Sequence, residues 1–353
     1  MSDLKAAYDL NYVTRLANAL GAGKTFIDSL WPMLESLEMK DRTIAIADAL
    51  HLHSGESFDR SESVLDALFE KGDWKGLEAW PMITVIERHG LESFDASMAL
   101  LQKWTHTFSG EFAIRPFLSR DFDRCMEVLT AWAADDDHHV RRLVSEGTRP
   151  RLPWGQQVKA IDDNFKALVE LISPLRLDES EYVRRSVANH LNDWSKIHPE
   201  KVKALVQKWD DTAEESWVRK HALRSLVKAG DAEALSMLGF KGVPTLDGFQ
   251  CSKSVSFPGH LEFEATLTNS TPSKITMVLD FAIEHQGSGG MRAAKVFKWK
   301  NLSLAPGEST TLKKRHGFKK ITTRRYYDGS HTWCLNANGV ELCRSEFELM
   351  GVL

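Results

Sequence analysis

This sequence has few cysteines, no long apolar run and no positive net charge. Only four of its 353 residues are cysteine, so no disulfide framework is predicted. No run of about 18 uncharged apolar residues occurs, and the first residues lack the basic segment and apolar stretch of a signal peptide. We therefore expect a cytoplasmic protein without a membrane-spanning helix.

The net charge is −4, which taken whole argues against a nucleic-acid partner, because phosphate binding usually leaves a basic footprint. The charge is unevenly distributed, however. Residues 240–353 hold 15 basic and 10 acidic side chains, a net charge of +5, which leaves −9 for residues 1–239. The two parts of the chain are therefore expected to have different electrostatic roles.

The spacing of apolar residues changes once along the chain. Residues 1–238 have apolar side chains at spacings of three and four, which is typical of helices. Residues 248–353 alternate with period two, as in LEFEATL at 261–267, with turns about every ten residues, which indicates an antiparallel β-sandwich. We predict an all-α domain over 1–238, a linker over 239–247 and an all-β domain over 248–353.

A short motif recurs in the helical part: an acidic residue, one or two others, valine, arginine and a second basic residue. Its valines are Val140, Val183 and Val218, separated by 43 and 35 residues. This period is typical of two-helix HEAT-like units that stack into a solenoid. A generic helical bundle is the alternative, because three weak copies can arise by chance.

The segment 181–197 is predicted to be a helix with an apolar and a polar arc. Helical geometry places Val183, Val187, Leu191 and Trp194 on one arc and Arg185, Asn189 and Asp193 on the opposite one. We therefore expect Trp194 in the core. Asp193 is expected to point away from the core, on a face that is either plain solvent surface or the concave binding surface.

Two motifs that suggest cofactors fail on inspection. The run GKT at 23–25 ends like a phosphate-binding loop, but Asn18 stands where the first glycine should be and no strand precedes it. The run DDDHH at 135–139 resembles a metal site, yet adjacent residues cannot all face one ion, and a repeat helix needs acidic capping here. We expect neither a nucleotide nor a metal.

The two last cysteines flank a predicted hairpin turn. A type I′ turn at Asn338-Gly339 would place Cys334 and Cys343 directly across two strands. A disulfide between them stays open, although a reduced pair is expected in a reducing cytosol.

The segment 145–155 (SEGTRPRLPWG) resists a purely structural interpretation. Its two prolines and two glycines forbid a continuous helix, so Trp154 cannot belong to an ordinary apolar stripe. The tryptophan either plugs a seam between repeats or, with its flanking arginines, forms a phosphate clamp with a stacking platform. Glu146 is expected to lie near the same place.

Long segments of the chain carry a resemblance to a known family. They are residues 4–8 (LKAAY), 110–117 (GEFAIRPF), 145–154 (SEGTRPRLPW) and 182–194 (YVRRSVANHLNDW). On these segments, and over nearly the whole chain, the sequence resembles the AlkC branch of the AlkC/AlkD alkylpurine DNA glycosylases, which are built from HEAT-like repeats. Residues 296–308 and 321–329 are similar to the Ig-like domain of some members. AlkD-like relatives have a tryptophan where this chain has Asn189, so Trp154 is the candidate for the aromatic contribution.

The resemblance implies a monofunctional DNA glycosylase that excises cationic alkylated purines, chiefly 3-methyladenine, as the first step of base excision repair. A cationic base leaves without a general acid, so the enzyme must mainly stabilise charge on the sugar and orient a water. We expect Asp193 to do this, with Glu111 and Glu146 assisting and Trp154 against the lesion. From its position alone, Glu111 could instead be a helix-start acid.

Duplex DNA containing alkylated purines is the expected partner of a monomeric protein, without a cofactor or a membrane. The cations expected to contact DNA are Arg141, Arg142, Arg149, Arg151, Arg184, Arg185, Arg219 and Lys220 in the helical part and Lys319, Lys320, Arg324 and Arg325 in the sandwich. At least half of the helical set could instead form salt bridges between repeats. The alternative function is a noncatalytic HEAT-repeat module that binds DNA structures or a protein partner.

Overall fold

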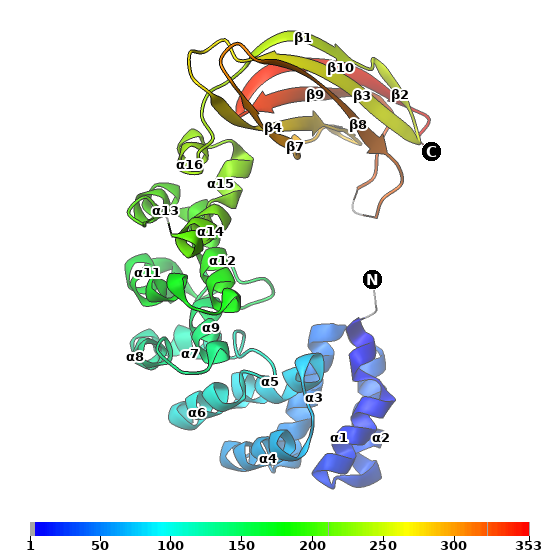
Figure 1. Ribbon diagram of the computed structural model, residues 1–353. Helices are drawn as coiled ribbons and strands as arrows, with labels where there is room; N and C mark the ends of the chain where they lie inside the picture. The colour runs from blue at the N-terminus through cyan, green and yellow to red at the C-terminus, as the bar shows by residue number, and fades with distance from the viewer. Residues whose placement is uncertain (1–3, 211, 323, 353) are drawn as a thin grey trace. The chain divides into compact units, whose positions relative to one another are not determined.

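The structure is a computed structural model that describes residues 4–210, 212–322 and 324–352 (Figure 1). Contacts divide the chain into two compact units. The helical unit runs to Ile197 and includes Asp210–Ala222, and the sandwich unit comprises His198–Trp209 and the chain from Leu223 onward. Within the described residues, no helix is long and apolar enough to span a membrane.

The helical unit contains α-helices and short 3₁₀ helices, the latter labelled η. They are η1 (Leu4–Tyr8), α1 (Leu10–Leu20), α2 (Gly23–Glu35), α3 (Met39–His53), α4 (Phe58–Lys71), η2 (Gly76–Ala79), α5 (Trp80–His89), α6 (Phe94–Trp104), α7 (Ile114–Arg120), α8 (Phe122–Trp132), α9 (His138–Gly147), α10 (Lys159–Asp163), α11 (Phe165–Ile172), η3 (Pro174–Leu177), α12 (Glu181–Ile197) and α14 (Ala213–Ala222). Figure 1 shows α5, α9, α12 and α14 in one row and α6, α8 and α11 in a second. Helix α12 packs against both α9 and α14. These two rows are the arrangement of a HEAT-like solenoid.

The recurring sequence motif marks the starts of three helices. Asp137 caps the N-terminus of α9, where its side chain accepts a hydrogen bond from the His139 amide. Glu181 lies in the first turn of α12 and Glu215 in the first turn of α14. The valine of each copy is buried, at 2% exposure or less. The motif therefore combines an acid near the positive end of the helix dipole with a residue that anchors the helix in the core.

The end of α9 lies very close to the segment that leads into α7. A Cβ atom added at Gly147, the last residue of α9, would lie 2.6 Å from Cγ2 of Ile114 and 3.5 Å from Cδ1 of Leu143. Ile114 is fully buried and branched at Cβ, so its methyl cannot swing away. Glycine at 147 therefore sets the distance between α9 and α7.

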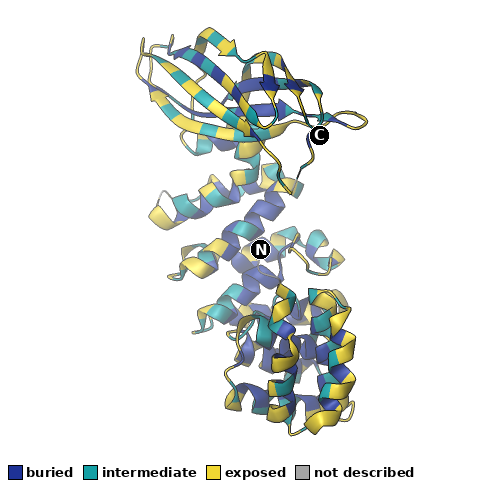
Figure 2. Ribbon diagram, turned by 90° about the vertical axis from the view of Figure 1, so that its right-hand side faces the viewer, coloured by how far each residue is buried: buried dark blue, intermediate teal, exposed yellow. Residues whose placement is uncertain are grey.

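The sandwich unit contains the remaining helices and all of the strands described. They are α13 (Pro199–Val206), α15 (Arg224–Ala229), α16 (Ala232–Met237), β1 (Thr245–Cys251), β2 (Ser254–Ser256), β3 (Gly259–Thr268), β4 (Ile275–Glu284), β5 (Gln286–Gly287), β6 (Gly290–Met291), β7 (Lys295–Leu304), β8 (Ser309–Phe318), β9 (Gly329–Ala337) and β10 (Val340–Met350). A three-stranded sheet has the order β1-β3-β8 and a five-stranded sheet the order β2-β10-β9-β4-β7, while β5 and β6 form a small pair. Buried residues alternate with intermediate or exposed ones along β3, and Figure 2 shows such changes in burial along the strands of the sandwich.

Aromatic side chains join the two large sheets. The Phe263 ring on β3 lies 5.1 Å from that of Phe281 on β4 and 4.4 Å from that of Trp333 on β9, measured between centroids. All three rings are nearly or fully buried. This sheet-on-sheet packing is the antiparallel sandwich that the period-two pattern predicts.

Specific contacts attach three helices to the sandwich. The ammonium of Lys203 on α13 is buried and lies 2.7 Å from Glu233 and 3.3 Å from Asp231 at the start of α16. Gly230, which ends α15 in the left-handed region, touches Gly339 in the β9–β10 turn so closely that neither position has space for a Cβ. The compact units therefore divide the chain within its helices, while the change from helices to strands falls between Met237 and Thr245.

The β9–β10 hairpin corrects the expected cysteine pairing. Asn338 and Gly339 have φ of 48° and 79°, as a type I′ turn requires. A register shift between Glu341 and Cys343 then places Cys343 opposite Leu335 and Cys334 opposite Arg344. The extra residue is a β-bulge, so the cysteines are not cross-strand neighbours, and both are free thiols.

We predict that Gly147→Ala lowers the free energy of unfolding by about 1–3 kcal/mol, because the new methyl forces α9 and α7 apart. Alanine has the higher helix propensity, so a loss must come from packing. The measurement is denaturant unfolding. Gly289→Ala is the control, because nothing lies within 4 Å of its added Cβ. Equal stability of both variants and the wild type would show that the two helices can separate freely.

Candidate active site: a buried row of carboxylates and cations

One face of α9 and one face of α12 together form a row of charged side chains. Positions 142, 146 and 149 succeed one another at spacings of four and three, so they follow a single face of α9 and its extension. Ser186 and Asp193 lie on the facing side of α12, seven residues apart. Glu111, which precedes α7, adds a carboxylate at one end.

Arg149 is at the centre of this row. Its Nε donates to Oδ2 of Asp193 at 2.9 Å, and its Nη1 donates to Oε1 of Glu146 at 2.6 Å. The other oxygen of Glu146 accepts a hydrogen bond from the Ser186 hydroxyl at 2.6 Å. At the Asp193 end, Lys196 lies 3.4 Å from Oδ1.

The row continues past Glu146 to Arg142 and Glu111. Arg142 lies 3.5 Å from Oε1 of Glu146 and makes a short hydrogen bond to Oε2 of Glu111. Its guanidinium also lies 5.0 Å from the centroid of the Tyr182 ring, a cation–π distance. Three carboxylates therefore alternate with three cations, so the row is formally neutral.

Burial makes this pairing energetically important. The exposed fractions of the carboxylate side chains are 2% for Asp193, 6% for Glu146 and 14% for Glu111. Burial alone would raise the pKa of Glu146, but Arg142 and Arg149 outweigh it and hold that pKa below its ordinary value. At Glu111 burial prevails over Arg142, and the pKa is raised. The two glutamates thus differ in their readiness to ionise.

The position of Asp193 differs from the expectation. The residue is 2% exposed and bonded to Arg149, whereas its arc of α12 was expected to face solvent or a concave surface. Within this arc, Arg149 from the loop that follows α9 covers Asp193, whereas Arg185 is exposed. Trp194 is fully buried, as predicted. Glu146 also lies in the last turn of α9 rather than in the tryptophan loop.

Trp154 is presented on the outside of the loop between α9 and α10. Its exposed fraction is 66%, and its φ of 64° lies in the left-handed region that tryptophan rarely adopts. The Lys40 ammonium bonds its carbonyl oxygen at 3.2 Å. This exposure excludes the seam-plug interpretation. It leaves an aromatic platform held by a strained backbone, which is common at functional sites.

The repeat motif sorts the predicted DNA-binding arginines into two groups. The arginine directly after each motif valine is used inside the fold: Arg141 bonds Asp178 at 2.6 Å, and Arg184 and Arg219 donate to backbone carbonyls of the loops before their helices. The second basic residue differs between the copies. It is Arg142, a member of the row, in the first copy. It is Arg185, which is exposed and bonded to Glu181, in the second and the exposed Lys220 in the third. Only this second position faces outward or the site.

Arg151 is not a member of the row, and the sandwich unit has cations of its own. Arg151 is half-exposed and pairs with Asp162 at 2.8 Å. In the sandwich unit, Lys319, Lys320 and Arg325 are exposed, whereas Arg324 bonds His285 at 2.6 Å. Lys320, Arg324 and Arg325 line a hollow of about 600 Å³ beside the largely buried Tyr326. The predicted basic cluster is thus partly surface and partly packing.

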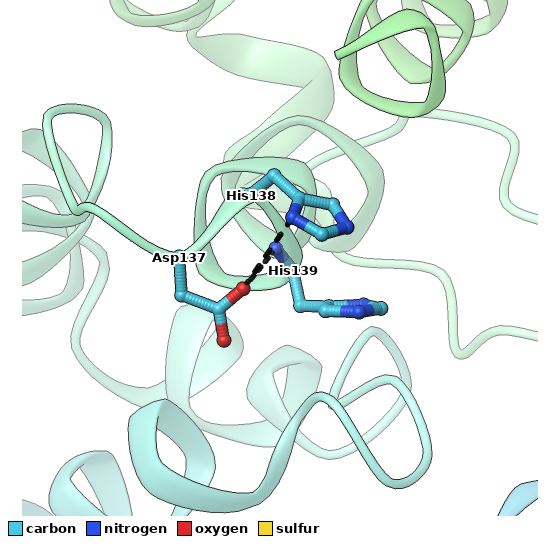
Figure 3. Close-up of side chains that lie close together, drawn as sticks. All are labelled: Asp137, His138 and His139. Atoms are coloured by element: carbon cyan, nitrogen blue, oxygen red, sulfur yellow. Dashed lines mark hydrogen bonds and ion pairs between the residues drawn. The ribbon is translucent and has the colours of Figure 1, made fainter.

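Asp137, His138 and His139 bring three potential metal ligands within 4.8 Å of one another (Figure 3). The carboxylate of Asp137 is already engaged by the His139 amide at 2.8 Å and lies 3.8 Å from the His138 ring. The sequence prediction that this run caps a helix is confirmed.

Sequence reasoning missed Ser186 and Tyr182. Both lie on the same side of α12 as Asp193, Ser186 seven and Tyr182 eleven residues before it, and a wider search along that arc would have found them. Tyr182 is 41% exposed beside Arg142 and close to His138 and His139. The row therefore ends in an exposed aromatic side chain.

Comparisons with known proteins show the family and the fold to which this chain belongs. A family model described as a DNA alkylation repair enzyme matches residues 83–226, and the model of the C-terminal Ig-like domain of the uncharacterised protein YhaZ matches residues 245–351. The chain belongs to the AlkC branch of the AlkC/AlkD alkylpurine DNA glycosylase family.

Two relatives show how far the similarity extends. The uncharacterized protein YhaZ of Bacillus subtilis is 31% identical over 96% of this chain and 97% of its own. The solved structure of the Pseudomonas fluorescens alkylpurine DNA glycosylase AlkC bound to DNA containing an abasic site analog has a TM-score of 0.90 and 32% identity, with 99% of each chain covered. Both parts of the molecule therefore have counterparts in one protein.

We predict that Arg149→Met destabilises the fold in a pH-dependent way. At pH 7 the change leaves Glu146 and Asp193 short of a cation and should cost about 3 kcal/mol of unfolding free energy. Because a lowered carboxyl pKa stabilises above the unfolded pKa, the wild type loses this contribution as pH falls below the ordinary value of 4.5.

The difference between wild type and Arg149→Met should therefore shrink below pH 4.5, as measured by urea unfolding across pH. Arg124→Met, which removes a half-exposed arginine paired with Asp95, is the control and should cost at most about 1 kcal/mol. A difference that stays constant with pH would contradict the pairing described.

Proposed function

We propose that this protein is a monofunctional DNA glycosylase that hydrolyses the N-glycosidic bond of cationic alkylated purines, chiefly 3-methyladenine, in duplex DNA. The observation that carries the proposal is the row containing Asp193, Glu146 and Glu111 in a chain similar over its whole length to an alkylpurine DNA glycosylase. It would act in the first step of base excision repair, on chromosomal DNA in the cytoplasm.

The chemistry needs charge stabilisation more than acid catalysis. A positively charged base already is a good leaving group, so departure puts positive charge on the deoxyribose, and a nearby carboxylate lowers that barrier. Of the Asp193 oxygens, Oδ2 is held by Arg149, whereas Oδ1 contacts only Lys196 among the described residues, at 3.4 Å. Oδ1 is therefore the atom assigned to the attacking water and the sugar.

Access to Asp193 requires movement of one neighbour. The aspartate is 2% exposed, but its partner Lys196 is 51% exposed and its long side chain rotates readily. DNA phosphate is the natural competitor for this ammonium. We expect Lys196 to move toward the backbone when DNA binds, while Arg149 stays in place and keeps Asp193 oriented.

Exposed side chains around the row would hold the DNA. Trp154 offers a bare aromatic face for a cationic base, and Arg185 and Lys220 lie on the outward repeat position. In the sandwich unit Lys319, Lys320 and Arg325 have the exposure that phosphate contacts need. The protein is proposed to act as a monomer.

We predict that Asp193→Asn abolishes release of 3-methyladenine from methylated duplex DNA while leaving duplex binding within a few-fold. The amide keeps the size of the side chain but removes the negative charge that stabilises the sugar cation. Base release is followed by chromatography of the freed base, and binding by fluorescence anisotropy. Asp163→Asn, which changes a 61% exposed aspartate, is the control and should behave as wild type.

Full residual excision by Asp193→Asn would refute the assigned role. Binding by the wild type without any base release would instead favour the noncatalytic module. Borohydride treatment should trap no covalent complex with DNA, because no lysine Schiff base is proposed.

We also predict that replacing Lys320 and Arg325 by alanine weakens DNA binding and reduces the slope of log affinity against log salt by about 2, roughly 0.9 for each lost phosphate contact. The control replaces the exposed Lys298 and Lys300 on β7 by alanine, which removes the same charge from another surface. Equal slopes for the two double variants would mean that the hollow beside Tyr326 makes no specific phosphate contact.

A further inference from the structure

Arg115 is a buried cation that forms no ion pair with a carboxylate among the described residues. It lies in the first turn of α7, its exposed fraction is 0%, and its hydrogen bonds go to backbone carbonyl oxygens alone. Burial lowers its pKa to about 10, so the guanidinium is still charged at neutral pH. A buried charge without a counter-ion is costly, and it persists only where the surrounding dipoles offset the cost.

Those dipoles come from both ends of the loop that carries Trp154. Nη1 donates to the carbonyls of Gly147 at 2.7 Å and Arg149 at 2.9 Å, and Nε donates to that of Gln156 at 2.6 Å. Gly147 ends α9, where carbonyl groups point outward without helical partners and the helix dipole is negative. One planar guanidinium thus closes the loop across nine residues.

The bonded carbonyls lie next to the functional side chains. Arg149, whose carbonyl Arg115 holds, uses its own guanidinium to join Glu146 and Asp193. Trp154 lies two residues before Gln156, with a backbone in the left-handed region that requires support from outside the loop. Since the loop has no regular secondary structure between Thr148 and Val158, these bonds do the work that a helix or sheet would otherwise do.

We propose that Arg115 is a positioning residue: it fixes the loop so that Arg149 stays between Glu146 and Asp193 and Trp154 stays presented outward. Only arginine suits this role, because its fork donates in several directions within one plane while a lysine ammonium is a compact point charge. The catalytic part of this inference rests on the proposed glycosylase function. The structural part does not.

The structural part is tested by trypsin digestion at a temperature at which all variants are folded. Trypsin can cut the loop after Arg151, whereas Arg149 is followed by proline and resists cleavage. Loss of three bonds to backbone carbonyls should increase cutting after Arg151 about tenfold or more in Arg115→Met and Arg115→Lys, because proteolysis follows the opened population.

The matched control is Arg120→Met, an arginine of the same helix α7 that is half-exposed and paired with Glu92. Trypsin should cut the loop of this variant at the wild-type rate. If Arg115→Met does not fold, Arg115→Lys keeps the charge and permits the same measurement. Unchanged cutting in a folded Arg115 variant would overturn the inference, whatever the enzyme activity.

The catalytic part is tested by single-turnover release of 3-methyladenine. Arg115→Lys should lower the rate about tenfold or more while affinity for abasic-analogue DNA changes only a few-fold, because the loop geometry fails rather than the grip. Combined with Trp154→Ala, the losses should be less than multiplicative, since both act through one loop. Fully multiplicative losses would contradict the role of Arg115 in positioning the loop. If the wild type released no 3-methyladenine, only the proposed function would be wrong.

Discussion

The pairing of Arg149 with two buried carboxylates is the interaction on which the rest of the site depends. Glu146 and Asp193 belong to different helices, and each would be repelled by the other if the guanidinium were absent. With it, and with Glu111, Arg142 and Lys196 completing the row, α9 and α12 hold these acids in a shared interior without a net charge. The close approach of these helices and the position of the loop follow from this arrangement.

Two further constraints keep Arg149 where it is. Gly147 lets the end of α9 lie against Ile114, and this contact fixes where the loop begins. In addition, Arg115 binds the backbone carbonyls of Gly147, Arg149 and Gln156. The segment 110–117 thus supplies Glu111 to the row and Arg115 to the loop, four residues apart on one turn, which links the two in a single structural element.

The sequence alone was enough to predict the helices and strands, but not which side chains contact one another. Periodicity predicted helices and strands, and the valine motif located the starts of α9, α12 and α14. It also placed Trp194 in the core. It could not reveal that Asp193 is covered, because a helical wheel gives the direction of a side chain and not what lies opposite.

The predicted cross-strand placement of Cys334 and Cys343 was wrong for a similar reason, although the hairpin itself is present. The turn type was readable from Asn338-Gly339, but a β-bulge shifts the register by one residue and carries no sequence signature of its own. The two groups of arginines could be told apart only in the structure. The arginine directly after each motif valine bonds a neighbouring loop, and the next basic residue faces outward or the site. Spacing alone treats adjacent arginines as equals.

Charge balance explains how an acidic helical region can meet a polyanion. Residues 1–239 have a net charge of −9, which would repel DNA if the acids were free. Within the row, however, Arg142, Arg149 and Lys196 match the three carboxylates in number, so the row itself adds no net charge. In the proposed mechanism, negative charge becomes available where a DNA phosphate draws a cation away, and we infer that this cation is Lys196, which is half-exposed beside Asp193. The substrate itself would thus uncover the charge that its own cleavage requires.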